Sequence, residues 1–350
     1  MPGAPRIEDF DYELPDELVA QQPLPGRSTS RLMVVDRATS SLEERRFSEL
    51  PTFLRAGDVI VRNDTRVVPA KIDGVRVDDA SAFTAMLYED LGGGRWKALV
   101  KPAKKLKIGT RFRLGGAVEG TVLAIPDAHV PSMLPGERWL DLGGADVRRL
   151  LEAAGSMPLP PYVKTFAGDP EQYQTTYARR PGAVSAPTAG FHFTPELFSQ
   201  IAALGVEVLD VTLHVGPGTF QPVRTSDYST HRMLGERYEI SADVAARVAA
   251  ARAEKRRVIA VGSTSLRTLE TAARDGLFPG GGQGSTDLYC TPGYAFRAVD
   301  AMITNFHLPR TTLLLLVMAF GGEELMKRAY SRAVADRFRF YSFGDAMFIK

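Results

Sequence analysis

Cysteine is nearly absent from this chain, because Cys290 is the only one in 350 residues. A single thiol excludes internal disulfides and a metal cluster held by cysteines, and it fits a reducing compartment. Long hydrophobic runs are also missing: the longest, LLLLVMAF (313–320), is far shorter than the roughly 20 residues of a membrane-spanning helix, so we expect a buried strand or helix there. The start, MPGAPRIEDFDYELP, is acidic and has no apolar core, unlike a signal peptide. We therefore expect a soluble, cytoplasmic protein without a membrane partner.

A strong charge of either sign is missing too. The net charge is +2 and the isoelectric point is near 8.6, which is too mild to indicate a nucleic-acid-binding protein by itself. Any RNA-binding surface must therefore be a local patch. The 44% of hydrophobic residues at this length indicates a globular protein with a large core, divided into two domains.

Several common catalytic motifs do not occur. The run GPGTFQ (216–221) lacks the third glycine of a dinucleotide-binding loop, and no P-loop or G-x-S-x-G motif is present. The histidines show neither H-x-x-x-H nor H-x-H spacing, and no box of Cys, Asp or Glu accompanies them. We therefore expect no metal site and no bound prosthetic group.

The pattern of short elements predicts the architecture. From residue 57 to about 150, short β-rich pieces separated by Gly, Pro and Asp turns predict a small all-β barrel or sandwich. Elsewhere, a short helix-prone segment lies at 15–22, and helices are expected at 146–155 and at 241–257, where Ser241 is a good N-cap. Strands are expected at 32–35, 206–213, 257–262 and 301–306. We predict an α/β main domain, the catalytic one, from residues 1–56 and 151–350, with an inserted small all-β, barrel-like domain at 57–150.

Four of the five histidines lie in the second half of the chain, at His192, His214, His231 and His307. Three of them occupy loops rich in Gly, Pro and Thr, namely APTAGFHFTP (186–195), TLHVGPGTFQPV (212–223) and ITNFHLP (303–309). Each loop follows an apolar or β-branched run, so we expect each loop to follow a strand and to lie at the end of a sheet. Open α/β sheets bind their ligands at that place. One such histidine is more often structural than catalytic. Three in one chain favour a site.

The run VIAVGSTSLRTLE (258–270) predicts a buried strand, a turn and a helix. The first N–H groups of that helix and the hydroxyls of Ser263, Thr264 and Ser265 can hold a carboxylate or phosphate. An ordinary helix cap is an equally good interpretation from the sequence.

Two charged motifs are open to two interpretations. RNDTRV (62–67) places Asp64 between Arg62 and Arg66, which suits an ion-paired turn or a substrate contact. KPAKKLKIGTRFR (101–113) contains Lys104, Lys105 and Lys107 among apolar residues. It is either a solvated face or a contact for an RNA backbone.

Together these motifs resemble one family, the S-adenosylmethionine:tRNA ribosyltransferase-isomerases of queuosine biosynthesis. The resemblance rests on the three histidine loops and, in addition, on RNDTRVVPAKI (62–72), PLPPYV (158–163), DPEQYQTTYA (169–178), VGSTSLRTLE (261–270), VDAMITNFHLP (299–309) and FGDAMFI (343–349). It implies transfer and isomerisation of the ribosyl moiety of S-adenosylmethionine onto 7-aminomethyl-7-deazaguanine at the wobble position of a tRNA anticodon. Epoxyqueuosine, adenine and methionine are the implied products. S-adenosylmethionine would be a co-substrate, tRNA the partner, and the protein a monomer.

The resemblance also implies residue roles. The reaction needs a base for a hydrogen next to the sulfonium and an acid for the departing adenine, and histidines suit both tasks. We expect His214 and His192 first, then His307, to transfer protons, with His231, Glu236 and Asp64 as further catalytic candidates. The expected substrate contacts are Arg66, Thr188, Phe191, Gly216, Gly218, Thr219, Phe220, Ser263, Thr264 and Ser265, with Lys104, Lys105 and Lys107 on the RNA.

The chain departs from the family pattern at Leu234, Gly235, Thr291 and Met318. The family commonly has a histidine where Leu234 stands. These departures leave two other hypotheses open. One is a paralogous ribosyltransferase that acts on a free deazapurine, and the other is a catalytically inactive tRNA-binding protein.

Overall fold

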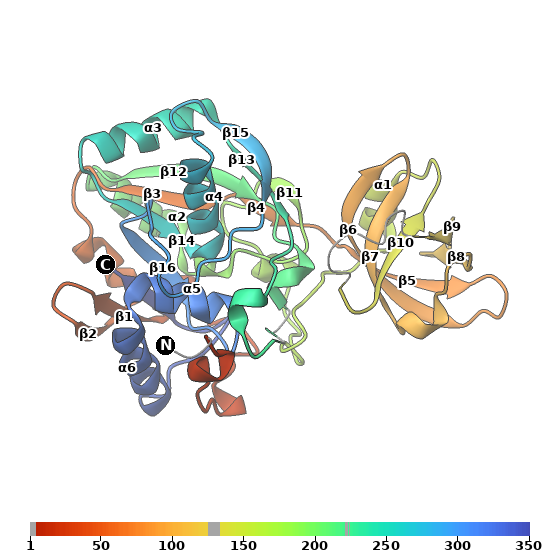
Figure 1. Ribbon diagram of the computed structural model, residues 1–350, viewed down its shortest axis with the longest axis horizontal. Helices are drawn as coiled ribbons and strands as arrows, with labels where there is room; N and C mark the ends of the chain where they lie inside the picture. The colour runs from red at the N-terminus through yellow and green to blue at the C-terminus, as the bar shows by residue number, and fades with distance from the viewer. Residues whose placement is uncertain (1–4, 125–133, 221–222, 224) are drawn as a thin grey trace.

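A large sheet and a separate closed barrel make up the molecule in the computed structural model, which describes residues 5–124, 134–220, 223 and 225–350 (Figure 1). The side chains of Thr219 and Phe220 lie outside the described part. The barrel stands to one side of the sheet and its helices, so the molecule is elongated. This arrangement confirms the predicted α/β domain with a small all-β domain inserted.

Nine strands form the large sheet, in the order β15-β13-β12-β3-β14-β16-β17-β1-β2. Its middle strands β12, β3, β14 and β16 are parallel neighbours. The bounds are β15 (Gly282–Thr286), β13 (Glu236–Ile240), β12 (Glu207–Leu213), β3 (Val59–Asn63), β14 (Val258–Val261), β16 (Ala301–Asn305), β17 (Ala346–Ile349), β1 (Arg31–Asp36) and β2 (Ser41–Arg46). All four residues of β14 are buried, as expected for a parallel strand covered on both faces.

Helices cover both faces of this sheet. One face packs against α3 (Ala242–Ala253), α4 (Gly262–Arg274), α5 (Thr312–Gly321) and α6 (Glu323–Ala335). The other packs against α2 (Pro195–Ala203) and the 3-10 segments η4 (Phe47–Phe53) and η7 (Thr188–His192). Ser241 caps α3 as predicted, by accepting a hydrogen bond from the backbone of Val244. Within the described residues, no helix has the length and apolarity needed to cross a membrane.

The barrel closes in the order β10-β7-β6-β5-β8-β9, with every neighbouring pair antiparallel. Its strands are β5 (Lys71–Arg76), β6 (Ala82–Gly92), β7 (Arg95–Lys101), β8 (Arg111–Leu114), β9 (Val118–Leu123) and β10 (Glu137–Asp141), and α1 (Val147–Ala154) covers one side. Ile72, Phe83 and Phe112 fill the interior together with Leu150 of α1. Closure leaves no unpaired strand edge in this small domain.

The start of the inserted domain differs from the prediction. The run 58–63 was expected in the barrel, but it forms β3 in the middle of the large sheet. A strand buried on both faces reads as a short apolar run, which the sequence alone does not distinguish from a barrel strand. β4 (Thr65–Val67) then pairs with β11 (Arg180–Ala183) outside both sheets. We propose that the inserted domain begins near residue 70.

Short 3-10 segments make up the remaining helical elements. The segment 15–22, which looked helix-prone, forms only the single turn η2 (Asp16–Leu18). The others are η1 (Ile7–Phe10), η3 (Arg27–Thr29), η5 (Ala103–Lys105), η6 (Pro170–Tyr173), η8 (Pro217–Phe220) and η9 (Tyr228–Thr230).

Candidate active site

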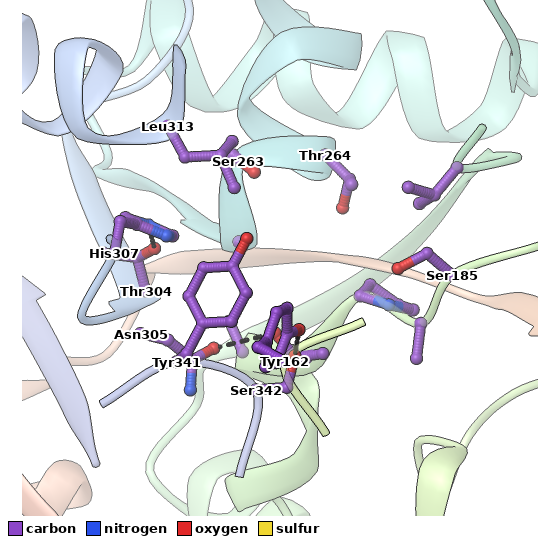
Figure 2. A pocket seen from close by; sticks show the side chains of 16 residues that line it. Tyr162, Ser185, Ser263, Thr264, Thr304, Asn305, His307, Leu313, Tyr341 and Ser342 are labelled. Carbon is purple, nitrogen blue, oxygen red and sulfur yellow. Dashed lines mark hydrogen bonds between the residues drawn. The ribbon is translucent and has the colours of Figure 1, made fainter. Parts of the chain in front are cut away.

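The predicted loops meet at one hollow, which lies beyond the carboxyl ends of β14 and β16 (Figure 2). We call it the central hollow. Its lining residues are Tyr162, Ser185, Ala186, Pro187, Thr188, Ala189, Val215, Gly262, Ser263, Thr264, Thr304, Asn305, His307, Leu313, Tyr341 and Ser342. They come from six separate stretches of the chain, so only the folded protein assembles the hollow.

The first turn of α4 forms one wall of the central hollow. α4 begins at Gly262, whose φ of +83° is a conformation that glycine adopts without strain. The first N–H groups of a helix have no partner within it. Thr264 is only 8% exposed, and its hydroxyl makes no hydrogen bond in the described structure. This end of α4 therefore offers donors and a positive dipole, which suit a carboxylate.

Ser265, predicted with Ser263 and Thr264, lies one layer deeper. It is completely buried, it does not line the hollow, and its hydroxyl also lacks a partner in the described structure. The fold thus divides the three predicted residues into two that line the central hollow and one that lies behind them.

His307 lines the central hollow, and the other three described histidines do not. Nε2 of its ring lies 2.9 Å from the Thr304 hydroxyl, and its backbone N–H donates to the Tyr330 hydroxyl at 3.0 Å. Burial lowers the pKa of His307 to about 3, because the charged form loses its hydration. The imidazole is therefore neutral near pH 7.

His192 is enclosed behind the wall of the central hollow. Its ring stacks on Phe47, with centroids 4.8 Å apart, and Nδ1 lies 2.7 Å from the Ser30 hydroxyl. The Asn305 amide nitrogen lies 3.2 Å from Nε2, while the Asn305 oxygen accepts the Thr188 hydroxyl at 3.1 Å. Burial lowers the pKa of His192 to about 3. With both ring nitrogens engaged, His192 orients Asn305 and Thr188.

His214 and Asp64 lie outside the central hollow. Nδ1 of His214 is 2.8 Å from the Thr65 hydroxyl, and burial lowers its pKa. Asp64 is almost completely buried, accepts the Thr212 hydroxyl at 2.6 Å, and pairs with Arg179 at 2.9 Å. Asp64 is therefore ion-paired, but with Arg179 of another segment; the neighbouring Arg62 and Arg66 pair with Asp210 and Glu171 instead.

Glu236 supports the glycine loop after β12. It accepts the backbone N–H of Gly216 at 2.8 Å and forms an ion pair with Arg267 of α4, and both side chains are 5% exposed. A Cβ atom added at Gly218 would lie 3.1 Å from the Leu234 side chain. Leu234, one of the residues that differ from the family pattern, therefore packs against this loop. Glu236 does not line the central hollow; it supports the loop that follows Val215, which does.

The other predicted residues lie elsewhere. His231 contacts the ring of Tyr289, Arg66 pairs with Glu171 at the surface, and Phe191 lines a second hollow. Lys104, Lys105 and Lys107 are exposed on the barrel. The predicted side-chain contacts of Thr219 and Phe220 fall outside the described residues.

Two tyrosines of the central hollow were missed from the sequence. The rings of Tyr162 and Tyr341 meet edge to face at 4.0 Å, and the Tyr162 hydroxyl lies 2.5 Å from that of Ser342. In Figure 2 the Tyr341 hydroxyl points towards the end of α4 that carries Ser263. Tyr341 has a φ of +72°, which is rare for a bulky residue and is common at functional sites. No local pattern in YSFGDAMF signals that conformation.

Among the described residues, no group of three or more His, Cys, Asp or Glu side chains is arranged to hold a metal ion.

Comparison with known proteins places this geometry in context. A profile described as queuosine biosynthesis protein matches residues 7–349. The S-adenosylmethionine:tRNA ribosyltransferase-isomerase of Symbiobacterium thermophilum is 49% identical over 98% of this chain and 99% of its own. The enzyme of that name from Anaeromyxobacter sp. is 48% identical over the same shares. A crystal structure of an S-adenosylmethionine tRNA ribosyltransferase from Thermotoga maritima is 35% identical, covers 98% of this chain and 100% of its own, and gives a TM-score of 0.56.

Proposed function

Since this chain belongs to the queuosine biosynthesis protein family, we propose that it acts as an S-adenosylmethionine:tRNA ribosyltransferase-isomerase. Sequence identities of 49% and 48% to two enzymes of that name, over 98% of this chain, support the activity predicted from the motifs. In detail, the ribosyl moiety of S-adenosylmethionine is transferred to 7-aminomethyl-7-deazaguanine at the tRNA wobble position and isomerised. Epoxyqueuosine, adenine and methionine are the products. The protein works as a cytoplasmic monomer without a prosthetic group.

The observation that carries this proposal is the central hollow with the first turn of α4 in its wall. The backbone N–H groups near Ser263 and the unpaired hydroxyl of Thr264 suit the methionyl carboxylate of the donor. The rings of Tyr162 and Tyr341 border the same space, and aromatic faces attract a cation such as the sulfonium. One end of the hollow thus suits the anionic group of the donor, and its aromatic wall suits the cationic group.

His307 is the residue to which we assign proton transfer. The sulfonium acidifies the hydrogens on the adjacent C5′ carbon, and removal of one of them requires a neutral base. The buried imidazole is neutral at pH 7, as a histidine base must be before it accepts a proton. That suits a group that takes a proton from the donor and returns one to departing adenine. Thr304 fixes the ring through Nε2.

The decisive experiment supplies purified protein with S-adenosylmethionine and tRNA that carries 7-aminomethyl-7-deazaguanine. Digestion and mass spectrometry should show epoxyqueuosine, with adenine and methionine released in equal amounts. S-adenosylhomocysteine as the main product would mean methyl transfer and would refute the proposal. Reaction with the free deazapurine but not with tRNA would identify the paralogous transferase, and tRNA binding without consumption of the donor would identify an inactive binding protein.

A further inference from the structure

A second hollow adjoins the central one. We call it the side hollow. Its lining residues are Pro23, Leu24, Pro25, Arg27, Ser30, Gln172, Phe191, His192, Ser342, Phe343 and Gly344. Ser342 lines both hollows. A further link is the hydrogen bond between His192, which lines the side hollow, and Asn305, which lines the central one.

Two short segments divide the hollows from each other. In η7, Thr188 and Ala189 line the central hollow, whereas Phe191 and His192 line the side hollow. In the segment 341–344, Tyr341 lines the central hollow, and Phe343 and Gly344 line the side hollow. The same two segments therefore line both spaces, so groups bound in the two hollows would lie beside each other, as transfer between two substrates requires.

The walls of the side hollow suit a flat, uncharged aromatic ring. Phe191 and Phe343 lie nearly parallel with centroids 5.9 Å apart, and Phe343 stacks in turn on Phe166 at 5.4 Å. The Arg27 guanidinium lies 5.6 Å from the centre of the Phe191 ring. Gln172, which is exposed, adds an amide to the lining. Aromatic faces beside a guanidinium and an amide are the usual surroundings of an unstacked nucleobase.

The charge of the side hollow suits an amine nucleophile. Arg27 lines it, and none of the described lining residues is a carboxylate. A nearby cation without a compensating anion lowers the pKa of an amine placed there. The amine is then unprotonated and free to act as a nucleophile.

We propose that the side hollow binds the acceptor, as a purine-like base that carries an amine and is turned out of the RNA anticodon loop. The inference rests on the proposed function, and it adds where the second substrate lies. Arg27, Gln172, Phe191 and Phe343 are its binding residues, and Ser342, which lines both hollows, marks the place where the amine would meet the donor.

The test obstructs the side hollow from its rim. Gln172 is exposed, so Gln172→Trp adds bulk without disturbing the core. We expect the KM for tRNA to rise by about 10- to 100-fold, the range of one lost base-stacking contact. The KM for S-adenosylmethionine should stay within about twofold, since Gln172 does not line the central hollow. Arg27→Gln should also raise the KM for tRNA selectively.

The matched control is Gln200→Trp, the same change at an exposed position of α2 that lines neither hollow. A second readout is the binding of an anticodon stem-loop with 7-aminomethyl-7-deazaguanine or guanine at the wobble position. Gln172→Trp should abolish the preference for the modified loop. The proposal is overturned if Gln172→Trp weakens donor binding instead, changes neither KM, or has no greater effect than the control. If the unmodified protein shows no turnover, the proposed function is refuted. The preference for the modified stem-loop would still show whether the side hollow binds the acceptor base.

Discussion

At the scale of single residues, the described histidines differ in what their ring nitrogens contact. Both nitrogens of His192 are occupied, and His214 is bonded to Thr65 away from the central hollow. His307 is bonded through Nε2 at the edge of the hollow itself. From the sequence the three looked alike, because each lies in a Gly/Pro/Thr loop after a strand. Only contacts between distant segments, such as Ser30 with His192, distinguish them.

The first prediction follows from this difference. His307→Asn should lower kcat by about 10² to 10⁴-fold, the range for loss of a positioned acid/base group. Donor affinity measured by calorimetry should change little, because the first turn of α4 remains in place. His214→Asn should have the smaller effect, since its ring does not line the central hollow. A larger loss of kcat for His214→Asn would restore the ranking that the sequence suggested.

The second prediction concerns stability against acid. The pKa of His192 falls from 6.5 to about 3 on folding because the ring is buried. As pH falls, the unfolded chain therefore binds a proton first, and the free energy of unfolding decreases between about pH 6.5 and pH 3. The slope for this one group is about 1.4 kcal/mol per pH unit. His192→Gln should reduce the total slope by about that amount in urea titrations at pH 6, 5 and 4. Gln200→His, which adds an exposed imidazole, should leave the slope unchanged.

At the scale of elements, the sequence predicted what local chemistry determines. Ser241 caps α3, the run 32–35 lies in β1, and the short strands separated by Gly, Pro and Asp turns between 71 and 141 form a barrel. It did not predict what depends on neighbours. The strand β3 joined the large sheet, and 313–320 became part of α5, because apolar runs of that length fit either element until packing decides.

The third prediction tests how elements support the central hollow. Arg267 of α4 and Glu236 of β13 form a buried ion pair, and Glu236 holds the backbone of Gly216. Arg267→Leu leaves a carboxylate buried without its cation, which should lower the free energy of unfolding by about 3–5 kcal/mol. Glu236→Gln combined with Arg267→Leu should cost less than the two single changes added together, as chemical denaturation can measure. Lys327→Leu, which breaks an exposed pair with Glu323, should cost under about 1 kcal/mol. Additive losses would mean that the pair is not coupled.

At the scale of the whole molecule, the two domains have separate cores. The barrel interior is one hydrophobic cluster, closed by α1, and the large sheet carries two others on its faces. Figure 1 shows the barrel standing away from the helices and strands that carry both hollows. Changes on the outer surface of the barrel should therefore affect contact with a large substrate without altering the chemistry. The sequence predicted this division, although it did not predict the separation in space.

The last prediction uses that separation to test the basic patch. Lys104, Lys105 and Lys107 are exposed, and none of them forms an ion pair within the described structure. If they contact tRNA phosphates, reversing all three to Glu should weaken tRNA binding. The log–log dependence on salt should flatten by about 0.7 to 0.9 for each lost contact. Donor affinity should not change, because the central hollow is built entirely outside the barrel. Arg252→Glu with Lys255→Glu is the control, since Arg252 is exposed at the end of α3 and Lys255 is exposed just after it, and α3 lies far from the barrel in Figure 1. An unaltered salt slope after the triple reversal would show that this patch is a solvated face, and a slope that flattens equally in the control would show a general effect of net charge.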